Sequence, residues 1–90
     1  MKMHVVKRKG HKEKFDERKL YASVYAACLL VEMKTKECEQ TASHVVKKIK
    51  SEIANKKEID AKKLHSLCVK NLKSKNKKAA FMYDTHKDIS

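Results

Sequence analysis

The fold of this chain is decided by residues 3–20, MHVVKRKGHKEKFDERKL. The segment opens with a short run that contains the β-branched pair Val5 and Val6. Gly10, the only glycine of the chain, follows where a tight turn needs a positive φ. We therefore expect a β-hairpin with strands at about residues 3–8 and 11–15. Because an isolated hairpin is marginal in water, it must pack against helices.

Amphipathic segments follow the hairpin. Asp16 can cap a helix, and Glu17 then faces the positive end of the helix dipole. Apolar residues recur at helical spacing from Leu20 onward, interrupted by short polar breaks. Helices are expected at about residues 17–32, 36–54, 61–74 and 77–88, with caps at Asp16, Thr35, Asp60 and Asn76. The predicted fold is α+β and mostly helical: a short N-terminal hairpin and then a bundle of about four helices, in one domain of residues 1–90.

Composition excludes several classes of protein. One glycine and no proline argue against an all-β fold with many tight turns. No apolar run approaches the roughly 18–20 residues of a membrane span, and no signal-peptide core follows the N-terminus, so a cytoplasmic protein without membrane contact is expected. The three cysteines, Cys28, Cys38 and Cys68, form no CxxC pair. Cys28 and Cys68 fall on apolar stripes and are expected to be small buried hydrophobic residues, and no structural metal is expected.

The positive charge is the strongest compositional signal. Lys and Arg total 23 against 11 Asp and Glu, which gives a net charge of +12. Such an excess suggests an anionic partner: nucleic acid, a free nucleotide or an acidic protein surface. A lysine-rich solvated surface is the alternative. The lysine runs near residues 56, 62 and 73–78 lack the interleaved aromatic residues that stack on bases.

The basic hairpin and the helix that follows it could hold phosphate. The guanidinium of Arg8 presents a planar fork that suits phosphate oxygens, while Lys7 adds a point charge. On an extended strand these two side chains would face opposite sides. Lys19 lies in the first turn of the predicted helix, where free N–H groups and the dipole favour an anion. Strand, turn and helix start would thus converge on one place, unless the hairpin is simply solvated.

Glu13 and Asp16 are carboxylates among many cations. They are either surface ion pairs or, in a nucleotide site, acceptors for the amino group of adenine. Apolar walls for a base are available at Val5, Phe15 and Leu20, which could equally be ordinary core residues.

Known catalytic and metal-binding patterns are missing from the sequence. His65 lies near the edge of the apolar stripe of the third predicted helix, where a lone histidine is more often packed or exposed than a ligand. The histidines form neither HxxxH nor HExxH. There is no GxxxxGK[ST] loop, and one glycine cannot make GxGxxG. An enzyme is therefore not expected.

The segment Val5-Val6-Lys7-Arg8-Lys9-Gly10, followed after two positions by Glu13-Lys14-Phe15-Asp16-Glu17-Arg18-Lys19-Leu20, strongly resembles the opening of an ATP-cone domain. The shared pattern is V-x-K-R-x-G, a second strand that ends in an apolar residue, an acidic or amide residue, and K-[IL] on the first helix. Similar domains precede the catalytic part of ribonucleotide reductases and occur in the bacterial repressor of reductase genes. They bind ATP or dATP as effectors and pass the signal to an attached domain.

The resemblance implies roles for individual residues. Lys7, Arg8 and Lys19 match positions that contact the phosphates, and Glu13 and Asp16 match positions beside the adenine amino group. The apolar walls around the base match Val5, Phe15 and Leu20, and His65 matches a histidine of the reductase branch. Ala61 stands where that branch often has a hydroxyl, and Lys87 is a looser match to a terminal phosphate-binding lysine. Mg²⁺ could accompany the nucleotide.

Neither a catalytic domain nor a zinc ribbon accompanies the domain within these 90 residues. We therefore expect a free-standing regulatory module that acts on a partner protein or through self-association, for instance as a homodimer. Two alternatives stay open at this point. The chain could be a transcription-linked protein that binds nucleic acid through its +12 charge, or an interaction module whose nucleotide site has decayed.

Overall fold

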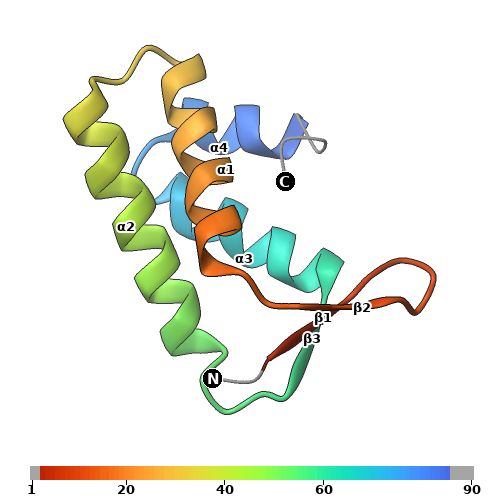
Figure 1. The fold of residues 1–90 in the computed structure, drawn as a ribbon. Helices are drawn as coiled ribbons and strands as arrows, with labels where there is room; N and C mark the ends of the chain where they lie inside the picture. Colours follow the sequence, from red (N-terminus) through yellow and green to blue (C-terminus); the bar gives the residue numbers. More distant parts are fainter. Residues whose placement is uncertain (1–2, 86–90) are drawn as a thin grey trace.

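The computed structural model describes residues 3–85 and consists of a small sheet at one end of four packed helices (Figure 1). The expected α+β, mostly helical class is confirmed. In chain order the elements are β1 (His4–Val6), β2 (Lys12–Lys14), α1 (Glu17–Leu30), α2 (Thr35–Glu52), β3 (Glu58–Asp60), α3 (Ala61–Lys73) and α4 (Lys77–Thr85).

The hairpin forms as expected, with shorter strands and a longer loop. Val5 of β1 pairs with Glu13 of β2 in an antiparallel register. The Lys7 N–H donates to the His11 carbonyl at 2.6 Å, the Gly10 N–H donates to the Lys7 carbonyl at 2.9 Å, and Gly10 has φ +81°. This pattern matches the three-residue hairpin loop that ends in a left-handed glycine. The placement of Lys7 and Arg8 on an extended strand is therefore wrong, since β1 ends at Val6, Lys7 closes the loop opposite His11, and Arg8 is the first residue of the loop.

The third strand was not expected from the sequence. β3 lies beside β1 in the order β2-β1-β3 and runs parallel to it, with Val5 opposite Ile59. A parallel pair needs a long crossover, which α1 and α2 provide here. β3 has three residues of which only Ile59 is buried, so it carries too little periodicity to be recognised. The sequence pattern there indicated only a polar break and a helix cap.

The helix ends follow local capping chemistry with one exception. The carboxylates of Asp16 and Asp60 accept from backbone N–H groups at the starts of α1 and α3, and the side chain of Asn76 accepts from the Ala79 N–H at 2.9 Å. Thr35 was expected to cap the second helix, but it is the first helical residue, and Lys34 precedes it without a side-chain cap. The last expected residues of the fourth helix, 86–88, lie outside the described range. No helix within residues 3–85 is long and apolar enough to cross a membrane.

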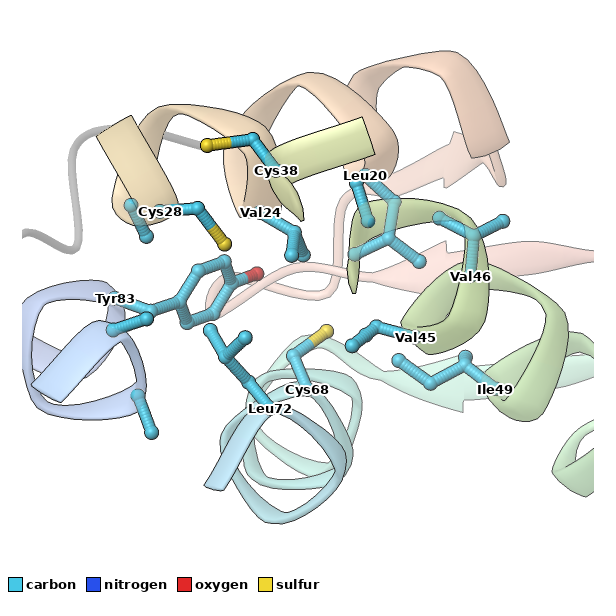
Figure 2. Packing of buried hydrophobic residues seen from close by; sticks show 14 of the residues in the cluster. Leu20, Val24, Cys28, Cys38, Val45, Val46, Ile49, Cys68, Leu72 and Tyr83 are labelled. Atoms are coloured by element: carbon cyan, nitrogen blue, oxygen red, sulfur yellow. The ribbon is translucent and has the colours of Figure 1, made fainter. Parts of the chain in front are cut away.

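The core lies where the four helices meet (Figure 2). Figure 2 shows Val24 of α1, Val45 and Ile49 of α2, Leu72 of α3 and Tyr83 of α4 directed toward one another. The three cysteines are fully buried free thiols, which confirms the expectation for Cys28 and Cys68 and adds Cys38. β1 adds Val5 to the same cluster, and β3 adds Ile59, so the sheet is anchored to the helices by two apolar side chains.

A strained residue ends α1. Glu32 has φ +60°, a left-handed conformation that costs an L-residue about 1–2 kcal/mol. Its N–H donates to the Leu29 carbonyl at 3.0 Å, and the Met33 N–H donates to the Cys28 carbonyl at 3.2 Å. These are the two hydrogen bonds of a Schellman motif, a helix end that normally has glycine at this position.

Replacing the strained residue by glycine should stabilise the protein. Glu32→Gly removes the steric cost of a Cβ at positive φ, but glycine loses more backbone entropy on folding. The net effect is expected to be a rise of about 0.5–1 kcal/mol in the free energy of unfolding. Urea denaturation followed by circular dichroism measures the change. Glu39→Gly, at an exposed interior position of α2, is the control and should destabilise by about 1 kcal/mol. A Glu32→Gly variant no more stable than the native chain would contradict this account.

The buried thiols should resist modification and weaken the fold at high pH. Burial raises the pKa of Cys28 and Cys68 from 9.0 to about 11. Because these folded-state pKa values exceed the unfolded value, the contribution of the neutral thiols to stability is complete below pH 9.0 and is lost as the pH rises toward about 11. Native protein at pH 8 should react slowly with a thiol reagent and rapidly in urea. Fast labelling of Cys28 or Cys68 in the native state would show that the packing is wrong.

Candidate functional site

A cleft of about 850 Å³ opens between the hairpin, the start of α1 and the start of α3. Its volume is within the range of roughly 300–1,000 Å³ that is typical of small-molecule sites. Nine of the ten predicted site residues line it: Val5, Lys7, Arg8, Glu13, Phe15, Asp16, Lys19, Leu20 and His65. The tenth, Lys87, lies outside the described residues.

The basic side of the cleft is built by the hairpin loop and the two helix starts. Because Lys7 and Arg8 lie where the chain turns rather than on a flat strand, both line the same cleft. Lys19 faces them from α1, and Lys62 faces them from α3. Lys7 forms an ion pair with Glu13 across the hairpin, with Nζ and Oε2 3.4 Å apart. An anion in the cleft would therefore compete with Glu13 for Lys7, whereas no ion pair within residues 3–85 engages Arg8.

The start of α1 offers less to an anion than the sequence suggested. The Oδ1 atom of Asp16 accepts from the N–H of Arg18 at 3.0 Å and from the N–H of Lys19 at 3.3 Å. These donors were expected to be free for phosphate, and that expectation is wrong because the capping carboxylate occupies them. Side-chain cations, rather than backbone N–H groups of Arg18 and Lys19, are left to contact a phosphate here.

The apolar wall of the cleft belongs also to the core. Val5 and Leu20 are each only 7% exposed and belong to the buried cluster, yet both line the cleft. Phe15 is half-buried and packs against the same cluster. The alternatives considered for these residues, core packing and a wall for a base, are therefore compatible. A flat apolar ring in the cleft would rest on side chains that the core already holds in place.

His65 closes the cleft toward the C-terminal helix. Its Nε2 atom lies 2.9 Å from Oδ1 of Asp84 on α4. Its ring stacks on Tyr83, with centroids 5.2 Å apart and planes inclined by 26°. Tyr83 is itself buried and lines the cleft. A group that contacts His65 in the cleft would therefore contact a residue that itself touches Tyr83 and Asp84 of α4.

Several cleft residues were missed at the sequence level: Lys14, Ser23, Lys62, Ser66 and Tyr83. In the sequence Lys62 stands out only as part of a lysine run. It reaches the cleft because β3 pairs with β1 and so places the start of α3 beside the hairpin. The capping signal at Asp60 predicted where α3 begins but not that the hairpin lies beside it. Lys62 could have been identified only by predicting β3 and its pairing with β1.

Five basic and three acidic side chains line the cleft, so its surface carries a net positive charge. The acidic members are Glu13, Asp16 and Asp60. Within residues 3–85 no three side chains of His, Cys, Asp or Glu gather as a metal site would require. The cleft thus combines an apolar wall, a cationic rim and a few hydrogen-bond acceptors, a combination that suits an organic anion such as a nucleotide.

The chain thus folds as a hairpin joined to four helices, with a cationic cleft between the hairpin and the starts of α1 and α3. The family model for the ATP cone domain matches residues 3–87. The chain therefore belongs to the ATP-cone family, whose members are nucleotide-binding regulatory modules and not catalytic domains. Among curated proteins none matches the chain.

The capping role of Asp16 can be separated from the effect of its negative charge on stability. Asp16→Ala removes the acceptor for two N–H groups and should lower the free energy of unfolding by about 1 kcal/mol. Asp16→Asn keeps a good cap and should lower it by much less. Urea denaturation of both variants measures this difference. Equal losses for Ala and Asn would mean that the charge of Asp16, rather than its cap, stabilises the helix.

Proposed function

We propose that this domain binds an adenine nucleotide, ATP or dATP, as an effector in the cleft between the hairpin and the starts of α1 and α3. The observation that supports this most is the convergence of the hairpin loop and both helix starts on one cleft of suitable volume. The family assignment supports nucleotide binding in general. The choice of adenine rests on the placement of individual side chains.

The phosphates are proposed to lie on the cationic rim. Arg8 can offer two parallel N–H donors to phosphate oxygens, which is the strongest pairing available there. Lys19 and Lys62 add charge from the two helix starts. Lys7 would exchange its ion pair with Glu13 for a phosphate, which leaves Glu13 with His11, whose Nε2 atom is 4.0 Å from Oε1, as its remaining partner. Lys87 remains a proposed contact to the terminal phosphate.

The base is proposed to lie against the apolar wall. Val5, Phe15 and Leu20 present apolar surface to the cleft. Once Lys7 has turned to the phosphates, the Glu13 carboxylate can accept from the 6-amino group of adenine. Asp16 can do the same through the oxygen that does not cap α1. Guanine presents a carbonyl at that position, which these carboxylates would repel, so the site should favour adenine.

Mg²⁺ would be held by the nucleotide rather than by the protein. Magnesium usually binds through phosphate oxygens and keeps several waters, with one or two carboxylates at most. The described residues form no metal cage of their own. His65 is proposed to contact the nucleotide at the end of the cleft nearest α4 and so to link occupancy to that helix. The regulatory output would be carried to a partner protein or to a second copy of the chain.

Nucleotide binding should appear as a rise in melting temperature. A ligand that binds only the folded state, at a free concentration one hundred times its Kd, raises the free energy of unfolding by about 2.7 kcal/mol. In a domain of this size that corresponds to a rise in melting temperature of roughly ten degrees or more. Melting curves with ATP, dATP and GTP, with and without Mg²⁺, measure this directly. ATP or dATP should stabilise more than GTP. No shift at millimolar ATP and dATP would contradict the proposal.

Two variants of the hairpin loop locate the phosphates. Arg8→Ala removes a cleft residue, whereas Lys9→Ala removes an equal charge from the next position, which does not line the cleft. Arg8→Ala should weaken ATP binding by about 10–100-fold, the value of a charge-assisted hydrogen-bonded contact. Lys9→Ala should leave ATP binding nearly unchanged. Isothermal titration calorimetry compares the two, and equal losses would indicate a diffuse charge effect instead of a site.

A further inference from the structure

A second cationic surface lies away from the cleft. We define the basic face as His44, Lys47 and Lys48 on α2 together with Lys75 in the connector between α3 and α4. None of these residues lines the cleft. All four side chains are exposed. Figure 1 shows the connector passing beside α2, which also packs against α3.

The four residues form one cluster although they come from two segments. His44 and Lys48 are one turn apart on α2 and therefore share a face of the helix. The connector that carries Lys75 passes beside α2 (Figure 1), and in agreement with this the pKa of His44 is lowered by partial desolvation and then by the charges of Lys75 and Lys48.

The basic face has no acidic counterpart among the described residues. Lys47, Lys48 and Lys75 take part in none of the ion pairs found within residues 3–85. Glu52 lies one turn beyond Lys48, but its carboxylate is engaged by the Asn71 side chain at 2.8 Å and by Lys70 at 3.9 Å. Unpaired like charges on neighbouring positions cost stability. An anionic partner would offset that cost.

The chemistry of the basic face favours one kind of partner. The large exposed apolar residues of the described chain are Leu29, Leu30 and Phe81, all outside this face. A bilayer surface would require apolar side chains to insert, and a stable protein interface would require an apolar centre. The face also has no Phe, Tyr or Trp ring, and His44 is its single ring on which an unpaired base could stack, whereas single-strand sites use several in succession. What remains is a set of cations suited to a regular array of phosphates.

We infer that the basic face binds the phosphate backbone of double-stranded nucleic acid without recognising base sequence. Lysine ammonium groups contact phosphate as point charges, and binding is driven by the release of counterions from the duplex. Lys73, Lys77 and Lys78 flank the connector in the sequence. The surface is separate from the cleft, so this inference does not depend on nucleotide binding.

The test compares two variants of equal charge. Lys47→Gln/Lys48→Gln/Lys75→Gln removes three cations from the basic face, and Lys9→Gln/Lys34→Gln/Lys36→Gln removes three from elsewhere. All six positions are exposed, so both variants should fold, as circular dichroism will show. Binding to short labelled DNA and RNA duplexes is measured by fluorescence anisotropy between about 50 and 200 mM salt. Vesicles that contain phosphatidylserine form a third arm.

The native chain should bind at least one duplex, with an affinity that falls steeply with salt. The basic-face variant should bind about tenfold more weakly or worse at low salt, and the slope of log K against log salt should fall by about 3, roughly one for each lysine replaced. The control variant should retain most of the affinity and most of the salt slope. The DNA and RNA arms show which duplex is preferred. Binding to neither duplex, binding to vesicles alone, or equal losses in the two variants would overturn the inference.

Discussion

The parallel pairing of β1 with β3 is the constraint on which the rest of the structure depends. It is short, three residue pairs supported by the hydrogen bond from the His4 N–H to the Lys57 carbonyl at 3.1 Å. It places Val5 beside Ile59, and both side chains enter the core. Because α3 begins directly after β3, the pairing brings the start of α3 beside the hairpin. Without it the hairpin loop would face solvent alone and there would be no cleft.

Much of this architecture could be predicted because the deciding signals are local. The helices follow from apolar spacing and from caps such as Asp16 and Asn76, and the hairpin loop follows from Gly10, whose φ of +81° only glycine adopts at little cost. β3 could not be predicted, because a single buried Ile59 has no periodicity and the pairing partner is about fifty residues away. The candidate site shows the same division. The residues of the hairpin and α1 were identified from spacing and family pattern, whereas Lys62 depended on a tertiary contact.

The distribution of charge explains how a +12 chain remains compact while two of its surfaces stay cationic. Many of its acidic side chains are committed to local structure. Asp16 and Asp60 cap helices, Glu17 pairs with Lys50 across α1 and α2, and Glu58 pairs with Lys12 across the sheet. Exposed pairs of this kind contribute little energy, about 0–1 kcal/mol each. Their effect is to neutralise Lys50 and Lys12 where helices and strands meet, while Arg8 and Lys62 in the cleft and all three lysines of the basic face stay outside the ion pairs found within residues 3–85.

The cleft is assembled from chain segments that lie far apart in sequence: the hairpin, the start of α1, the start of α3 and Tyr83 near the C-terminal end of α4. The described chain has no disulfide to join these segments, since its cysteines are free thiols. A ligand held there would link the N-terminal hairpin to α4 by contacts that break when the ligand dissociates. Separating the hairpin from the helices would then require the ligand to leave first. A bound ligand would thereby raise the free energy needed to separate the hairpin from the helices. A partner that binds only one of these two states could respond to the ligand without contacting it.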